Sequence, residues 1–489
     1  MPQPDLLIFL SDQHHGNYTG YAGHPVVRTP NLDRLAADGV AFDTAYTACP
    51  LCVPARSAFL TGQLPSVTGI FSNQGAIPVD QPTFIHSIAA EGYETVLCGR
   101  MHFVGDDQRH GFTKRIMGEI TPLYWGRGGK KRADLGPYVG TFSKERCLEV
   151  VGGGDSPVLA YDRAVVQAAL DYLQEDHEKP QCVVVGTYAP HFSYVAPTEL
   201  YAYYRDLAEL PHHNAVDVLA GNPILSNKQN RIDSELMRDV RAAYFGMIEN
   251  IDQQIGSVHQ AWRQYLDRNE RQGLFVYLSD HGDQAGEHHF YGKETFFEGS
   301  ARIPIVVSGH GIEGFQGGRN IQGAVSMLDI GPTLCDLIGA VAPPEQSGQS
   351  LLPQLLGETE NLERAVLSEY VVKDEKGHRV PARMVRKGKW KLISYTYFEE
   401  HDLLFDLAGD PLEGTNLRHE QPSVYRELRA ILETDWDIPT IVKRQEQKEA
   451  YYRLLSKWGA RADVKEEERW PIPESARQLP DRNPKREAR

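Results

Sequence analysis

The sequence is poor in cysteine, in positive charge and in long apolar runs. Its six cysteines in 489 residues are too few for a disulfide-linked scaffold. Its 51 Lys and Arg against 66 Asp and Glu give a formal net charge of −15, so the basic surface that non-specific nucleic-acid binding requires is missing. No stretch approaches the roughly 18 apolar residues of a membrane span, and the apolar run at residues 6–10 is too short for a signal peptide. We therefore expect a cytoplasmic protein without nucleic-acid or membrane partners.

Short apolar runs that lead into polar residues alternate with amphipathic stretches. Three such apolar runs lie at the start of the stretches DLLIFLSDQHH (5–15), QCVVVGTYAPHF (181–192) and GLFVYLSDHGD (273–283). Each run leads into Asp or His. Helical periodicity marks residues 31–40, 236–262 and 326–340. Alternating strands and helices predict an α/β fold, whose sites lie beyond the carboxyl ends of the strands. We therefore expect the three apolar strands to deliver their polar ends to one edge of the sheet.

The length and a shift in composition predict three segments. A chain of 489 residues suits one large α/β domain with additions, which we place at residues 1–365. Short strand-like stretches separated by turn signals follow, and they predict a small C-terminal α+β domain at residues 366–435. Residues 436–489 are polar and charged, and we expect a helix with an extended tail. This tail is either an arm for homo-oligomerisation or a solvated helix with a frayed end.

Cys49 and Cys52 form a Cys-x-x-Cys pair, which raises the question of a redox or zinc site. A zinc ribbon needs a second pair of ligands, which the sequence lacks, and the surroundings do not look like a thioredoxin-like unit. Pro54 instead favours the first turn of a helix that ends before Gly62. Cys52 would then lie at the helix N-terminus, where anions are stabilised, with Arg56 one turn further on. This arrangement suits attack on a tetrahedral oxyanion ester, whereas Cys49 reads as an incidental small residue.

The stretch CVPARSAFLTG (52–62) resembles the signature of the type I sulfatases, a family of the alkaline phosphatase superfamily. The resemblance implies that a formylglycine-generating enzyme oxidises Cys52 to Cα-formylglycine, whose hydrate supplies the attacking oxygen. It also implies an alkaline-phosphatase-like α/β sandwich. Its large, mixed but mostly parallel central sheet would be flanked by helices, and a smaller antiparallel sheet domain would follow at the C-terminus.

Further stretches match the family in the same order along most of the chain. They are SDQHH, GRMHFVG with Arg100 where the family has lysine, YAPHFSYVAP, and SDHGDQAGEHHFYGKETFFEGSARIP. The resemblance implies metal ligands at Asp12, Gln13, Cys52, Asp280 and His281. It implies catalytic roles for Cys52, Arg56, His102, His191 and Lys293, and substrate contacts for Arg100, Lys293 and His191.

Each of these residue types suits its expected role. Carboxylate oxygens favour one divalent cation, with Ca²⁺ foremost, and the nitrogen of His281 makes Mn²⁺ an alternative beside Mg²⁺. The cationic side chains would hold sulfate oxygens in a chain that is acidic overall. His191 would protonate the leaving oxygen, and His102 would hydrogen-bond to the hydrate.

Taken singly, most of these residues have an ordinary structural interpretation as a helix cap, a turn residue or a solvated lysine. Their joint occurrence in the order of the family favours the functional interpretation. Four further histidines lack this support, and we expect them in surface loops, with substrate contact as the alternative. They are His14, His15, His288 and His289.

The predicted reaction is hydrolysis of a sulfate monoester. The stretches ACPLCVPARSAFLTGQLPS, GRMHFVGDDQRHGF, FFEGSARIP and DWDIPTIVKRQEQ most resemble choline-sulfatase-like members. The substrate is then choline-O-sulfate, whose ammonium group needs an aromatic or acidic cage, or a sulfated carbohydrate or aryl ester. A phosphonate monoester or phosphodiester hydrolase on the same scaffold is the first alternative, and a catalytically inert oxyanion-binding protein is the second.

Overall fold

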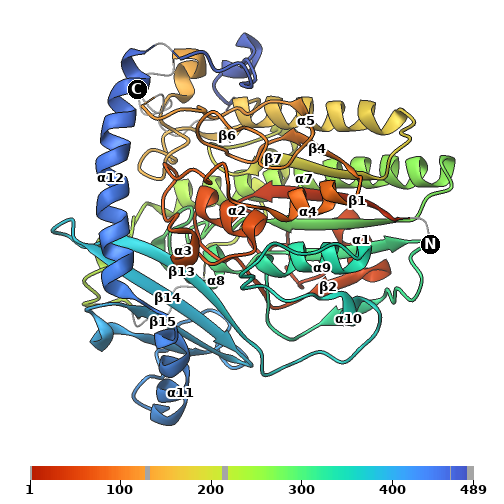
Figure 1. Cartoon of the computed structure of the whole chain (residues 1–489). Coiled ribbons are helices and arrows are strands. Elements are labelled where there is room, and N and C mark those ends of the chain that lie inside the picture. Colours follow the sequence, from red (N-terminus) through yellow and green to blue (C-terminus); the bar gives the residue numbers. More distant parts are fainter. Residues whose placement is uncertain (1–2, 127–132, 212–217, 463, 482–489) are drawn as a thin grey trace.

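An eight-stranded sheet runs through the middle of the larger part of the molecule (Figure 1). The computed structural model describes residues 3–126, 133–211, 218–462 and 464–481. The strand order is β11 (Arg319–Ile321), β2 (Val40–Phe42), β10 (Ile305–His310), β9 (Gly273–Ser279), β1 (Asp5–Asp12), β7 (Gln181–Pro190), β4 (Glu94–Gly99) and β5 (Lys114–Met117). The five strands β9, β1, β7, β4 and β5 are parallel to one another, and β10 is antiparallel to β9 and to β2.

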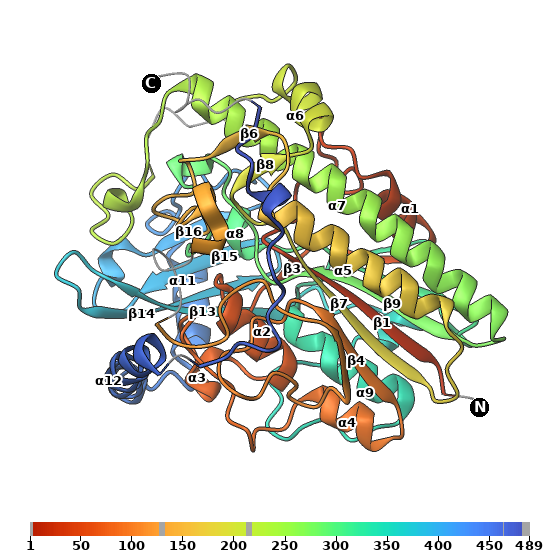
Figure 2. The same ribbon diagram turned by 90° about the horizontal axis from the view of Figure 1, so that it is seen from above.

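Helices cover both faces of this sheet. Because the side chains of β1 alternate between the two faces, this strand is buried along its whole length. Leu7 and Phe9 pack toward α1 (Pro30–Asp38), α5 (Pro157–Gln174) and α7 (Ser234–Arg268). Leu6, Ile8 and Leu10 pack toward α2 (Cys52–Thr61), α4 (Phe84–Ala90) and α9 (Ile330–Ile338). Figure 2 shows α5 and α7 side by side over one face, with α2, α4 and α9 on the other.

Shorter elements connect these layers. They are α3 (Pro65–Thr68), α6 (Thr198–Arg205), α8 (Glu298–Ala301), α10 (Leu352–Leu355) and two small parallel ladders, β3 (Ala45–Tyr46) with β12 (Val325–Ser326) and β6 (Val151–Gly153) with β8 (Tyr194–Ala196). Among the described residues, no helix has both the length and the apolarity that crossing a membrane takes.

A second, antiparallel sheet follows the large one, as predicted. It consists of β13 (Ala365–Lys373), β14 (Arg379–Lys387), β15 (Trp390–Tyr395) and β16 (Leu403–Asp406). A turn at Gly388, with a φ of 52°, separates β14 from β15. One face of this sheet packs against α11 (Pro422–Glu433), and the other packs against Phe296 and Phe297 of the larger part. The division of the chain at residues 365 and 435 stays a prediction.

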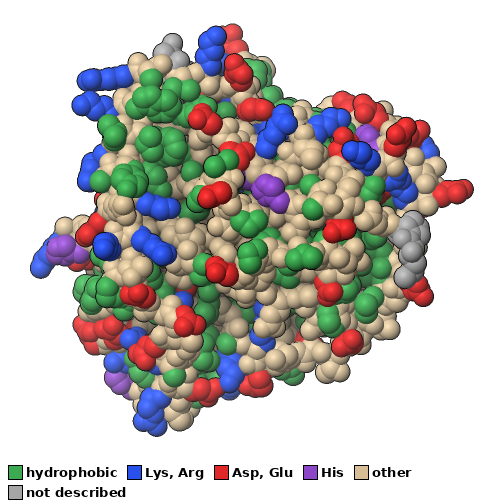
Figure 3. Space-filling model, in the orientation of Figure 1, with side chains coloured by type: hydrophobic (Ala, Val, Ile, Leu, Met, Phe, Trp, Pro, Cys, Tyr) green, Lys and Arg blue, Asp and Glu red, His purple; other side chains and the backbone are tan. Residues whose placement is uncertain are grey.

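The chain then returns to the larger part along α12 (Ile438–Arg461), which lies on one side of the molecule (Figure 1). Tyr451, Leu454 and Trp458 are exposed on this helix, and hydrophobic side chains gather there beside Lys and Arg (Figure 3). Residues 464–481 bind to their own chain, through backbone bonds such as that between Trp470 N and Glu119 O at 2.8 Å. An oligomer contact through this region stays a prediction.

Candidate active site

The three predicted strands deliver their polar ends to the same edge of the sheet. β1 lies between β7 and β9 and is parallel to both. Asp12 is the last residue of β1, His191 directly follows β7, and Asp280 directly follows β9. This convergence confirms the prediction from the apolar runs, because neighbouring parallel strands end at one edge.

Residue 52 enters the same space from α2, whose predicted bounds are confirmed. The helix begins at Cys52 and ends at Gly62, which takes the left-handed conformation with a φ of 70° and closes the last turn with a bond from its N–H to Ala58 O. Cys52 is only 1% exposed. Cys49 is a separate, buried free thiol, so the pair forms no disulfide and Cys52 alone faces the site.

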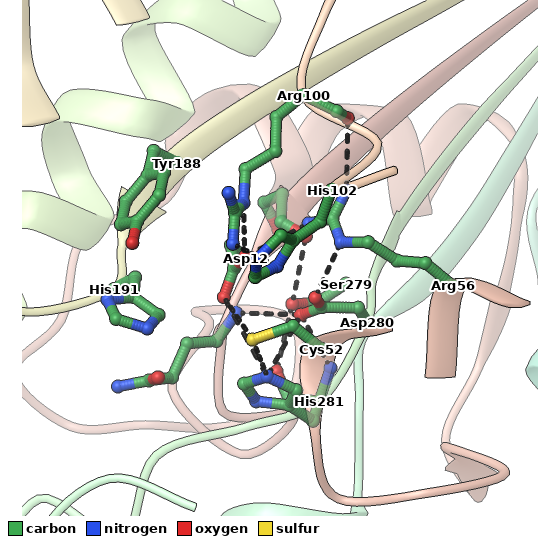
Figure 4. Close-up of polar contacts among 12 residues, drawn as sticks. Asp12, Cys52, Arg56, Arg100, His102, Tyr188, His191, Ser279, Asp280 and His281 are labelled. Atoms are coloured by element: carbon green, nitrogen blue, oxygen red, sulfur yellow. Dashed lines mark hydrogen bonds and ion pairs between the residues drawn. The ribbon is translucent and has the colours of Figure 1, made fainter. Parts of the chain in front are cut away.

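Residue 52 and three further side chains form a buried cluster (Figure 4). One ligand atom from each of Asp12, Cys52, Asp280 and His281 lies within 4.8 Å of the others. His281 Nε2 is 3.2 Å from Cys52 Sγ, 3.7 Å from Asp12 Oδ1 and 3.6 Å from Asp280 Oδ1. Sγ marks the place of the oxygens that residue 52 would carry after conversion to formylglycine. These are four of the five residues that the resemblance implies as metal ligands, the fifth being Gln13.

Two buried arginines orient the carboxylates. Arg56 donates from Nε to Asp280 Oδ2 at 2.8 Å and from Nη2 to Asp12 Oδ2 at 3.2 Å, and Arg100 donates from Nε to Asp12 Oδ2 at 2.7 Å. The Oδ1 atom of each carboxylate is thereby turned toward the cluster. Burial raises the pKa of Asp12, but the nearby cations, Arg100 foremost, outweigh it and hold that pKa well below its usual range.

The donor set fits a divalent cation. Two carboxylate oxygens, one imidazole nitrogen and residue 52 face a common point. Gln13 gives an argument for a bound cation that does not depend on the resemblance. Its buried Oε1 has no hydrogen-bond partner in the described part of the chain. Its Nε2 donates to Asp283 Oδ2 at 2.6 Å, and its backbone N donates to Asp280 Oδ1 at 3.1 Å. A bound cation would satisfy the Gln13 oxygen that the protein leaves without a partner.

A cavity of about 290 Å³ opens above residue 52. Lys293 lies on its floor, with Nζ donating to Cys52 Sγ at 3.0 Å. Burial and Asp12 raise the pKa of Cys52, but Lys293 and His281 outweigh them and lower it from its ordinary value. Residue 52 is therefore surrounded by groups that stabilise negative charge on its side chain. The predicted site residues that line the cavity are Cys52, Arg100, His102, His191 and Lys293.

The two histidines of the cavity are held in opposite tautomers. His102 Nδ1 accepts from Arg100 Nη2 at 2.8 Å, and since arginine can only donate, neutral His102 carries its proton on Nε2. His191 Nδ1 donates to the carbonyl oxygen of Phe192 at 2.6 Å, so its Nε2 is the acceptor. Burial, reinforced by Arg100 for His102 and by Lys293 for His191, holds both pKa values well below their usual range.

The surface-loop prediction is wrong for two of the four unsupported histidines. His14 and His15 are fully buried, because the loop after β1 packs beneath aromatic residues. His14 Nδ1 is 2.6 Å from the hydroxyl of Tyr277, and burial lowers the pKa of His14 to about 4. His15 stacks on Tyr18, with ring centroids 4.0 Å apart. His288 and His289 are half-buried in a loop, and neither lines the cavity above residue 52.

Arg56 does not line the cavity, and its expected contact with sulfate oxygens stays a prediction. Sequence reasoning missed two buried carboxylates that hold the predicted residues. Asp283 binds Gln13, and its signal was present as the second aspartate of SDHGD. Glu119 binds Arg100 at 3.0 Å, and as a lone glutamate it carried no spacing signal.

Comparisons with known proteins agree with this geometry. The family profile described as Sulfatase matches residues 4–340, and one described as N-sulphoglucosamine sulphohydrolase, C-terminal, matches residues 286–436. The choline-sulfatase of Rhizobium meliloti (strain 1021) is 33% identical over 468 residues, which cover 89% of this chain and 87% of that protein. An arylsulfatase of Clostridium perfringens (strain 13 / Type A) is 27% identical over 444 residues, which cover 85% of this chain and 90% of that protein.

Among solved structures, the phosphonate monoester hydrolase of Agrobacterium radiobacter is similar to this chain with a TM-score of 0.69. The two are 22% identical, and the likeness covers 93% of this chain and 96% of that one. At this identity the likeness concerns the fold alone. Together with the strand order, it confirms the predicted alkaline-phosphatase-like sandwich with a small C-terminal sheet.

Proposed function

This chain belongs to the sulfatase family, in its choline-sulfatase-like branch, and is a sulfuric ester hydrolase; we propose that it cleaves sulfate monoesters to an alcohol and inorganic sulfate in the cavity above residue 52. The observation that carries this proposal is the setting of residue 52. Its Sγ lies 3.0 Å from Lys293 Nζ and 3.2 Å from His281 Nε2, at the floor of a cavity and beside two buried carboxylates.

We further propose that Cys52 is converted to formylglycine and that one divalent cation is held by Asp12, Gln13, residue 52, Asp280 and His281. The aldehyde hydrate would supply the nucleophilic oxygen, and the cation, when bound, would polarise the sulfate oxygens. Ca²⁺ suits the oxygen ligands best, and Mn²⁺ suits the imidazole. Maturation would require a formylglycine-generating enzyme as a partner.

The chain's own side chains supply the rest of the chemistry. Lys293 offsets negative charge at the attacking group and at the sulfate. The Nε2–H of His102 is a donor whose direction is fixed by Arg100. Arg56 binds both Asp12 and Asp280 and orients the two carboxylates. Nε2 of His191 would take the proton that the attacking hydroxyl loses and pass it to the leaving oxygen.

For the alcohol we propose choline first and aryl or sugar alcohols second. Phe142, Tyr188 and Phe192 line the cavity together with Glu145 and Glu294. The rings of Phe142 and Tyr188 are 5.3 Å apart, and such faces with nearby carboxylates suit a quaternary ammonium group. The relationship to a choline-sulfatase supports this choice.

The test compares three esters with the mature, metal-loaded enzyme at one pH. We expect choline-O-sulfate and 4-nitrophenyl sulfate to be hydrolysed faster than an aryl phosphonate monoester. The donor set with Gln13 and His281 also permits the phosphonate reaction, so the comparison decides between the two. A phosphonate rate higher by orders of magnitude would overturn the proposal.

Replacing His191 by asparagine should separate good from poor leaving groups. Proton donation matters most when the departing alkoxide is basic, so turnover of choline-O-sulfate should fall roughly 10²- to 10⁴-fold. Turnover of 4-nitrophenyl sulfate should fall far less, because nitrophenolate leaves without a proton. Steady-state kinetics on the two esters measures the difference. His310→Asn is a suitable control, since His310 pairs with Asp267 away from the cavity. Equal losses on both esters would rule out the acid role.

A further inference from the structure

We propose that Glu119 is a positioning residue for the active site and that the C-terminal strap, defined as residues 464–481, holds it in place. The inference rests on the proposed function, because its consequence is the placement of His102 and Arg100. The structure brings together three segments that are remote in sequence. They are the loop after β4, the segment after β5, and residues 464–481, drawn in dark blue in Figure 2.

Glu119 is fully buried and both of its carboxylate oxygens are engaged. Oε1 accepts from Arg100 Nη1 at 3.0 Å and from the backbone N–H of Ile120 at 3.0 Å. Oε2 accepts from the backbone N–H of His102 at 2.8 Å. One carboxylate therefore binds a cavity guanidinium and a cavity histidine at the same time, which fixes the two relative to each other.

The bond to His102 acts at a strained position. His102 has a φ of 57°, in the left-handed region that non-glycine residues rarely adopt. Such a conformation persists where the surroundings hold it, and the Glu119 carboxylate is the group that binds its N–H. The guanidinium of Arg100, fixed by Glu119, in turn donates to His102 Nδ1. Glu119 thus holds both the backbone and the ring of His102.

The strap binds the backbone of Glu119 from the other side. The N–H of Glu119 donates to Glu468 O at 2.8 Å, and the N–H of Trp470 donates to Glu119 O at 2.8 Å. These two bonds form a parallel β-bridge between Glu119, whose side chain binds Arg100, and Arg469. Glu466 Oε1 accepts from the N–H of Leu123 at 2.8 Å, and Trp470 packs edge-on against Tyr161. The strap therefore fixes the position of the Glu119 backbone, from which the carboxylate extends to Arg100 and His102.

The first experiment replaces Glu119 by glutamine, which keeps the size but places an amide against the donors of Arg100 and His102. We expect kcat on choline-O-sulfate to fall roughly 10- to 100-fold, as for partners of ligating groups, with KM little changed. Glu433→Gln, at an exposed ion pair with Arg429, is the matched control. A kcat equal to that of the unsubstituted enzyme would overturn the proposal.

The second experiment tests the strap through a matched pair of variants. Trp470→Pro removes the N–H that binds Glu119 O, whereas Trp470→Ala keeps it. We expect a lower kcat for the proline variant than for the alanine variant. In the Glu119→Gln background this difference should vanish, because the strap acts through Glu119. Equal kcat values for Trp470→Pro and Trp470→Ala would refute the role of the strap. The same would follow if Trp470→Pro lowered kcat by the same factor with and without Glu119→Gln.

A readout without turnover separates this inference from the proposed function. The ¹⁵N resonances of His102, assigned by their loss in His102→Gln, report whether Nδ1 or Nε2 carries the proton. The unsubstituted protein should show a single Nε2–H form, and Glu119→Gln should show a mixture. This result would stand even if no sulfate ester were hydrolysed. An unchanged signature in Glu119→Gln would overturn the positioning role whatever the activity.

Discussion

Replacing Cys52 by alanine should abolish sulfate ester hydrolysis. The proposed nucleophile is made from this side chain, and removal of a nucleophile costs roughly 10⁴-fold or more in kcat. In the unsubstituted chain, activity should rise in proportion to the fraction of residue 52 that has been converted. Mass spectrometry of the peptide that contains Cys52 measures this fraction, since conversion of a thiol to an aldehyde lowers the mass by roughly 18 Da.

Cys49→Ala is the matched control for this prediction. Cys49 is buried three residues earlier and does not line the cavity, and burial raises the pKa of its thiol well above its usual value. The variant should keep its activity and the mass change at residue 52. A fully active enzyme with an unmodified Cys52 peptide would contradict the formylglycine proposal, whereas activity after Cys52→Ala would contradict any role for residue 52.

Arg56→Ala should cause a large loss of stability. Arg56 is 1% exposed and lies between Asp12 and Asp280, both fully buried. Removing it leaves two buried carboxylates short of a counter-charge, which costs about 3–5 kcal/mol in the free energy of unfolding. Urea unfolding in the presence of a chelator measures this cost. Added Ca²⁺ should restore more stability to Arg56→Ala than to the unsubstituted chain, because a cation then offsets the same carboxylates.

The pH dependence of this loss has a defined sign. Asp12 has a pKa held well below its ordinary value, so its contribution to stability is present above the pKa of the unfolded chain and is lost as pH falls through the folded pKa. Arg56 is one of the cations that lower this pKa. Arg56→Ala should therefore begin to lose the contribution of Asp12 at a higher pH during acid titration.

Two controls bound the Arg56 prediction. Arg56→Lys keeps the charge but cannot bind two carboxylates with a rigid fork, so it should recover only part of the stability. Arg146→Ala removes an arginine from an exposed pair with Glu149 and should change stability little. An Arg56→Ala variant that unfolds at the same urea concentration as the unsubstituted chain would refute the buried bridging role.

The fold and the meeting of three loops could be predicted because they depend on local patterns. The runs that became β1, β7 and β9 have apolar centres, which is typical of central parallel strands, and all three strands are buried along their whole length. Pro54 and Gly62 bounded α2 for reasons of backbone geometry alone. Lys293 is different: only the family resemblance singled it out, because nothing in its neighbourhood predicts that it reaches residue 52 across 241 positions.

The contacts of Arg56, Glu119 and His14 were beyond sequence reasoning. A guanidinium can serve a substrate or a pair of carboxylates, and only tertiary structure decides which lies within reach of Arg56. Glu119 is a lone carboxylate between apolar residues, without a periodic partner. His14 belongs to a polar pentapeptide that resembles an exposed loop, yet its ring binds the hydroxyl of Tyr277, 263 residues further along the chain.

The burial of residue 52 sets an order of events during biosynthesis. Cys52 is 1% exposed, and Asp280, His281 and Lys293, which enclose it, are made more than 220 residues later. A formylglycine-generating enzyme, if it acts here as we propose, would have to reach the thiol before β9 takes its place beside β1. If residue 52 is converted as we propose, a chain that folded first with its thiol intact would have to unfold before the conversion.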